Sequence, residues 1–107
     1  MDLVLDIGNF RIKGAFFQEE KIVSFFVLPH DAAPIEELLD RNPPSAVFFS
    51  SVHSSVDIPI KEILKKKEIP FSEIDFRKVK VILDVEEPED VGQDRIANVY
   101  GALFHFP

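Results

Sequence analysis

The first third of the chain consists of apolar runs separated by polar turns. Residues 2–6 hold three successive apolar positions, Leu3, Val4 and Leu5, which is typical of a strand covered on both faces. Two further apolar runs with aromatic doublets, at 11–17 and 21–28, are separated by the polar turn at 18–20. The three runs predict a three-stranded antiparallel meander.

After the meander, helical and extended patterns alternate. Helical stretches show apolar residues three and four positions apart, whereas the extended stretches are short continuous apolar or β-rich runs. The expected order is a helix within 31–44, a strand at 46–49, a helix at 59–67, strands at 71–76 and 79–83, and a helix at about 93–106. This order predicts an α/β fold with a mixed sheet, in which the meander is followed by α-β-α-β-α crossovers.

Composition indicates a folded chain that forms a single domain over residues 1–107. Hydrophobic residues make up 46% of the chain and charged residues 29%, so disorder is not expected. The net charge of -7 argues against a nucleic-acid partner, and the basic run Lys65-Lys66-Lys67 is expected to be the solvated face of a helix. The chain has no cysteine, no export signal at its start and no apolar run of membrane-spanning length, so we expect a cytoplasmic protein without a membrane partner.

Asp6-Ile7-Gly8-Asn9 follows the first predicted strand and is the first candidate for chemistry. A carboxylate at a strand end can hold hydrated Mg²⁺, Gly8 would let the backbone approach a bulky anion, and Asn9 offers an amide donor. The same residue types are also the commonest in an ordinary β-turn. Taken alone, the motif leaves both interpretations open.

A second candidate precedes the last predicted helix, at Asp90-Val91-Gly92-Gln93-Asp94-Arg95. Backbone donors at a helix start and a guanidinium can hold a ligand carboxylate while an aspartate accepts a proton. A helix cap and surface charges are the alternative interpretation.

Other polar side chains carry weaker signals. Ser50, Ser51, His53 and Asp57 contain the residue types of a hydrolase triad, but the G-x-S-x-G elbow that such a serine needs is absent. The three histidines are too scattered in the sequence to predict a metal site.

Three motifs in this order resemble the N-terminal half of type III pantothenate kinases. They are LVLDIGNFRIKGAFF at 3–17, FFSSV at 48–52 and EPEDVGQDRIANVYGA at 87–102. That family belongs to the actin, hexokinase and Hsp70-like kinase superfamily, so the resemblance implies a ribonuclease H-like lobe. It also implies ATP-dependent phosphorylation of pantothenate to 4'-phosphopantothenate, the first step of coenzyme A biosynthesis.

The resemblance assigns the first motif to ATP phosphates and the third to pantothenate. Asp6 would contact Mg²⁺ through Mg-ATP, and Asp94 would accept the proton of the pantothenate hydroxyl while Arg95 contacts the substrate carboxylate. A monovalent cation, K⁺ or NH₄⁺, and a homodimer are also implied. The implied phosphate-binding residues are Asp6, Ile7, Gly8, Asn9, Phe10, Arg11, Ile12 and Lys13, and the implied pantothenate-binding residues are Gly92, Gln93, Asp94 and Arg95.

The chain also departs from the family pattern. Phe10 stands where the family has Thr or Ser, Val85 falls about where many members have a tyrosine, and Gln93 replaces a frequent small residue. The second lobe, with its monovalent-cation aspartate, is expected to be absent from residues 1–107, so we expect this chain by itself to bind ATP poorly. A non-catalytic kinase-like binding module and another kinase of the same superfamily remain as alternatives.

Overall fold

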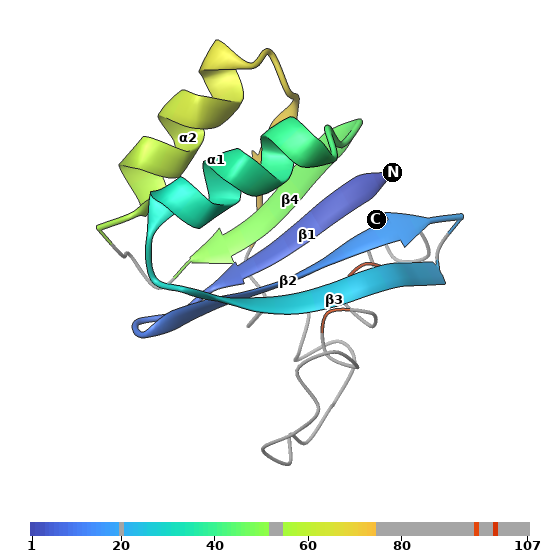
Figure 1. Ribbon diagram of the computed structural model, residues 1–107, viewed down its shortest axis with the longest axis horizontal. Coiled ribbons are helices and arrows are strands. Elements are labelled where there is room, and N and C mark those ends of the chain that lie inside the picture. Colours follow the sequence, from blue (N-terminus) through green and yellow to red (C-terminus); the bar gives the residue numbers. More distant parts are fainter. Residues whose placement is uncertain (20, 52–54, 75–95, 97–99, 101–107) are drawn as a thin grey trace.

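The computed structural model describes residues 1–19, 21–51, 55–74, 96 and 100, and its described strands form one mixed sheet (Figure 1). Two helices cover one face of this sheet. In chain order the elements are β1 (Asp2–Ile7), β2 (Arg11–Gln18), β3 (Lys21–Pro29), α1 (Ala32–Arg41), β4 (Ala46–Ser51), α2 (Asp57–Lys66) and β5 (Phe71–Glu73).

The strand order across the sheet is β3-β2-β1-β4-β5. β1 and β3 both pair antiparallel with β2, which confirms the predicted meander. β4 pairs parallel with β1 and with β5, so α1 and α2 each lie on a connection that leads into a strand parallel to β1. β1 is therefore the central strand, with its carboxyl end beside that of β4.

Both faces of β1 are covered, as the successive apolar residues Leu3, Val4 and Leu5 predicted. The face beneath the two helices carries the larger cluster, which we call the helix-side core. Because side chains alternate along a strand, every second residue of β1 and β2 contributes to it. Its buried members are Leu3, Leu5, Ile7, Ile12, Phe16, Ile35, Leu39, Val47, Phe49, Val56, Ile60 and Leu64.

The other face of the sheet carries a second cluster, which we call the opposite-face cluster. Its buried members are Val4, Ala15, Phe17, Ile96 and Tyr100. Ile96 and Tyr100 are helical and pack with Val4 and Phe17, on the face of the sheet away from the helix-side core. The predicted strand at 79–83 and the other residues of the helix predicted at 93–106 lie outside the described residues.

Local sequence explains where α1 begins and ends. The Asp31 carboxylate caps the first turn by accepting a hydrogen bond from the backbone N–H of Ala33 at 3.1 Å. The helix ends at Arg41, before the pair Pro43-Pro44, because a proline offers no N–H to a further turn. The predicted stretch, 31–44, therefore contained the helix and its flanking residues.

α2 begins at Asp57, two residues before the predicted start, and Pro59 lies within its first turn. Proline is tolerated there because the first N–H groups of a helix have no partner within the helix. Lys65 and Lys66 are exposed at the end of α2, as expected of a solvated basic run. Lys67, the next residue, forms an ion pair with Asp40 of α1.

β4 is two residues longer than predicted, because Ser50 and Ser51 continue the parallel pairing with Asp6 and Ile7 of β1. β5 is shorter than the apolar pattern suggested and ends at Glu73. None of the described helices is long and apolar enough to cross a membrane.

Candidate phosphate-binding site

The candidate site is built on the hairpin that joins β1 to β2. Ile7 pairs with Ile12, and beyond this pair the Gly8 N–H donates a hydrogen bond to the Arg11 carbonyl at 3.0 Å. Asn9 and Phe10 thus form the tip of the turn, and the Phe10 side chain is 89% exposed.

Gly8 is not in the left-handed region of backbone space, so a positive φ does not explain the glycine. A Cβ atom at this position would lie 3.2 Å from the Arg11 carbonyl oxygen, which is a tight contact. The glycine therefore allows the two backbone segments to approach closely at the tip of the hairpin.

Strand alternation places three charged side chains on one face of the sheet. Asp6 shares its face with Val4, while Arg11 and Lys13 share the face of Ala15, and both apolar residues belong to the opposite-face cluster. Asp6 lies directly opposite Lys13 in the antiparallel register. Side chains at such paired positions have Cβ atoms about 4.5–5.5 Å apart, so the carboxylate and the lysine are close neighbours.

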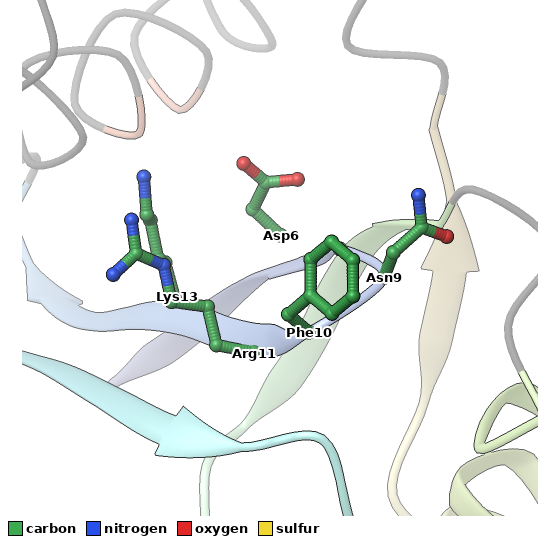
Figure 2. A pocket seen from close by; sticks show the side chains of 6 residues that line it. Asp6, Asn9, Phe10, Arg11 and Lys13 are labelled. Atoms are coloured by element: carbon green, nitrogen blue, oxygen red, sulfur yellow. The ribbon is translucent and has the colours of Figure 1, made fainter.

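These side chains line an open cavity of about 180 Å³. In Figure 2 the Asp6 carboxylate and the cationic ends of Arg11 and Lys13 rise from the same side of the hairpin, with Phe10 and Asn9 at its tip. Among the described residues that line the cavity, two cations and one carboxylate give a local positive excess in a chain whose net charge is -7. Such a charge set suits a polyphosphate that carries a divalent cation.

Six of the eight predicted phosphate-binding residues line this cavity: Asp6, Gly8, Asn9, Phe10, Arg11 and Lys13. Ile7 and Ile12 do not, because the register turns their side chains into the helix-side core, where both are fully buried. Only their backbone atoms could contact a ligand on the hairpin.

The polar end of β4 divides between the two faces of the sheet. Ser50 is the register partner of Asp6, whereas Ser51 is the partner of Ile7, which belongs to the helix-side core. The Ser51 hydroxyl donates a hydrogen bond of 2.5 Å to an Asp57 carboxylate oxygen at the start of α2. This contact joins the end of β4 to α2, and the sequence did not predict it because the two residues are separated by a turn.

The predicted acceptor-binding residues, Gly92 to Arg95, lie outside the described part of the chain. Ile96, which follows them, is fully buried in the opposite-face cluster. In the described ranges, no group of three or more His, Cys, Asp or Glu side chains could hold a metal ion by itself. A divalent cation at Asp6 would therefore need oxygen ligands from its phosphate and from water.

A family model described as type III pantothenate kinase matches residues 2–107. The chain belongs to the type III pantothenate kinase family. A type III pantothenate kinase from Cytophaga hutchinsonii is 30% identical over 109 residues, an alignment that covers 100% of this chain. The chain spans 44% of the length of that relative.

The likeness to a solved structure concerns the fold. RuvC of T. thermophilus, solved in complex with a Holliday junction substrate, superposes with a TM-score of 0.58 at 14% sequence identity. The match covers 94% of this chain and 93% of RuvC. The match confirms the predicted ribonuclease H-like fold. At 14% sequence identity it shows the fold alone, and no function of RuvC is assigned to this chain.

Proposed function

We propose that this chain supplies the phosphate-binding hairpin of an ATP-dependent pantothenate kinase. The observation that carries the proposal is the convergence of Asp6, Arg11 and Lys13 on one cavity at the carboxyl end of the central strand. Family membership supports the choice of pantothenate as phosphoryl acceptor. The substrate and the reaction remain proposals, since the chain spans less than half of its relative.

In the proposed reaction the hairpin positions and neutralises the transferring phosphate. Lys13 and Arg11 would donate charge-assisted hydrogen bonds to phosphate oxygens, while Asp6 would hold Mg²⁺ through its water shell. Phosphoryl transfer requires an aligned nucleophile and charge stabilisation more than covalent help from the protein. A small set of fixed charges on a rigid hairpin suits that task.

The acceptor side of the proposed site is assigned to Gly92–Arg95. Asp94 would orient the pantothenate hydroxyl and receive its proton, and Arg95 would bind the pantothenate carboxylate. A carboxylate is a weak base, so its main contribution would be to hold the hydroxyl in line with the phosphate, with proton transfer late in the reaction.

The test uses protein expressed from the complete reading frame that encodes this chain, in a coupled ATP-turnover assay with pantothenate. Asp94→Asn should lower kcat by about 100-fold or more, because positioned acid–base groups contribute about 10²–10⁴. Lys13→Met should lower kcat/KM by about 10- to 100-fold, since a hydrogen bond to a charged group is worth about 1.5–3 kcal/mol. Lys21→Met is the matched control, because Lys21 is an exposed lysine at the other end of the meander.

The proposal fails if wild-type protein does not consume ATP in the presence of pantothenate. The roles assigned to Asp94 and Lys13 are wrong if Asp94→Asn and Lys13→Met are as active as Lys21→Met. The 107-residue chain assayed alone should show no pantothenate-dependent turnover at millimolar substrate, and turnover by it would refute the view that the active site needs further residues.

A non-catalytic binding function is the second candidate, and Phe10 is the observation that favours it. Phe10 replaces a family hydroxyl at the tip of the hairpin, and this residue is 89% exposed beside the charged side chains. Under this alternative, wild-type protein would show no turnover and Phe10→Thr would restore it. Under the kinase proposal, wild-type protein is active and Phe10→Thr changes the KM for ATP without being required.

A further inference from the structure

A buried tyrosine ties the opposite-face cluster to the start of the chain. The Tyr100 hydroxyl donates a hydrogen bond of 2.6 Å to an Asp2 carboxylate oxygen, although the two residues are 98 positions apart in the sequence. Tyr100 is 5% exposed, so this hydroxyl lies at the end of a side chain that is otherwise enclosed. A buried hydroxyl with a charged partner fixes its side chain more strictly than apolar packing does.

Aromatic packing adds a second restraint on the same side chain. The Tyr100 ring stacks on Phe17 of β2, with ring centroids 4.1 Å apart and planes inclined by 14°, and meets Phe48 of β4 edge-on at 6.5 Å. The ring is thus held by β2 and β4, which flank β1 on its two sides. Packing by itself would tolerate a rotation of the ring, whereas the hydrogen bond to Asp2 selects one position of it.

Asp2 and the candidate phosphate site lie on the same face of one strand. Asp2, Val4 and Asp6 alternate along β1 with the side chains of the helix-side core. Four steps of about 3.3 Å along the strand place Asp2 roughly 13 Å from Asp6. β1 is therefore a rigid connection between the phosphate hairpin at one end and the Tyr100 contact at the other.

Ile96 extends this connection toward the predicted acceptor segment. Ile96 and Tyr100 are both helical and buried in the same cluster, and residues four apart lie on one face of a helix. Asp94 is two positions before Ile96 in the sequence. Because only two peptide units join Asp94 to Ile96, a contact that holds Ile96 and Tyr100 on the sheet also limits how far Asp94 can lie from β1.

We propose that Asp2 and Tyr100 are positioning residues for the acceptor side of the active site. Their hydrogen bond fixes Tyr100 against β1 and, through the short chain that leads back to Asp94, restrains the acceptor-binding segment relative to the phosphate held by the hairpin. This inference rests on the proposed kinase function. Its physical basis is that displacing a reacting group by about 1 Å can cost about 10²-fold in rate.

The experiment compares four variants of the protein expressed from the complete reading frame: Tyr100→Phe, Asp2→Ala, Asp2→Asn and the Tyr100→Phe/Asp2→Ala double variant. Tyr100→Phe retains the stacked ring and removes only the hydroxyl. Asp2→Asn retains an oxygen that can accept from Tyr100, so it serves as the conservative variant. KM and kcat are measured separately for pantothenate and for ATP, together with the melting temperature.

Tyr100→Phe and Asp2→Ala are each expected to lower kcat/KM for pantothenate by about three- to tenfold, the equivalent of one lost hydrogen bond. The KM for ATP should stay within about twofold, since the hairpin is not moved. Asp2→Asn should recover most of the loss, and the double variant should be no worse than either single variant because both remove the same contact.

Ile60→Val is the control for a purely structural effect. Ile60 is fully buried in the helix-side core, and this change costs about 0.5–1.5 kcal/mol of stability without touching the opposite-face cluster. It should lower the melting temperature and leave both KM values unchanged. If Tyr100→Phe behaves like Ile60→Val, with pantothenate kinetics within about twofold of wild type, the positioning role is refuted while the kinase function stands. Wild-type protein without pantothenate turnover overturns the kinase function, and the positioning role with it.

Discussion

A single methyl group added at Gly14 should lower the stability of the chain, because neighbouring side chains crowd this position. It lies in the middle of β2, where its register partners are Leu5 on β1 and Phe26 on β3. A Cβ atom at Gly14 would lie 2.4 Å from Phe26 Cζ and 2.9 Å from Leu5 Cδ2. Carbon atoms in contact are ordinarily about 3.5–4.0 Å apart, so the Phe26 ring would have to move by about 1 Å.

Two opposing effects set the expected size of the change in stability. Overpacking a core site costs about 1–3 kcal/mol. Replacing glycine by alanine stabilises a protein by about 0.4–1 kcal/mol where the backbone permits it. The Gly14 backbone does permit it, because its φ is not positive. The difference between the two ranges is about 0–2.6 kcal/mol, so Gly14→Ala should lower the free energy of unfolding by about 1.3 kcal/mol, which corresponds to about 5–10 °C in the melting temperature of a domain of this size.

Urea and thermal unfolding of the chain, followed by circular dichroism, measure this effect. Phe26→Leu provides the decisive comparison, because a shorter side chain should leave room for the new methyl group. The Gly14→Ala change should then be neutral or stabilising in the Phe26→Leu background, with a coupling of about 0.5–3 kcal/mol between the two sites. A stabilising effect of Gly14→Ala in the wild-type chain, or strictly additive changes, would refute the argument from crowding.

Three further substitutions, each removing one polar contact, can be tested by the same unfolding measurements. Ser51→Ala should lower the free energy of unfolding by about 1.5–3 kcal/mol, because Asp57 loses a hydrogen bond of 2.5 Å in a partly buried place, and Ser51→Thr should restore part of it. Asp31→Ala should cost about 0.5–2 kcal/mol through loss of the cap on α1, with Asp31→Asn close to wild type. Glu73→Gln should cost less than about 1 kcal/mol, because its 3.1 Å ion pair with Lys61 is half exposed, and the small effect should vanish in 1 M salt. A large, salt-independent loss for Glu73→Gln would contradict this view of the pair.

Much of the fold could be predicted because its signals are local. The three successive apolar residues Leu3-Val4-Leu5 predicted a strand covered on both faces, and the polar turn after β2 predicted the meander. The ends of the elements were harder to place. The predicted strand ended at Phe49, before the polar residues Ser50 and Ser51, yet both belong to β4 because β1 offers them a parallel partner. Pairing with a distant strand supplies hydrogen bonds that no local pattern records.

The candidate site was predictable in part for a similar reason. The motif indicated residues 6–13, but only the register separates the six residues that line the cavity from Ile7 and Ile12, which are core residues. The phenylalanines of β2 were also ambiguous in the sequence. The structure assigns Phe16 to the helix-side core and Phe17 to the opposite-face cluster, so neither forms a surface for a partner.

The sequence by itself determined the order of the described elements, the chemistry of the hairpin tip and the motifs that place the chain in its family. These depend on residue types at short spacing, which a single sequence displays directly. Tertiary structure alone decided that Lys13 lies opposite Asp6, that Ser51 meets Asp57 and that Tyr100 meets Asp2. Such contacts depend on strand register and on which face a helix covers, and both are set by packing among segments far apart in the chain.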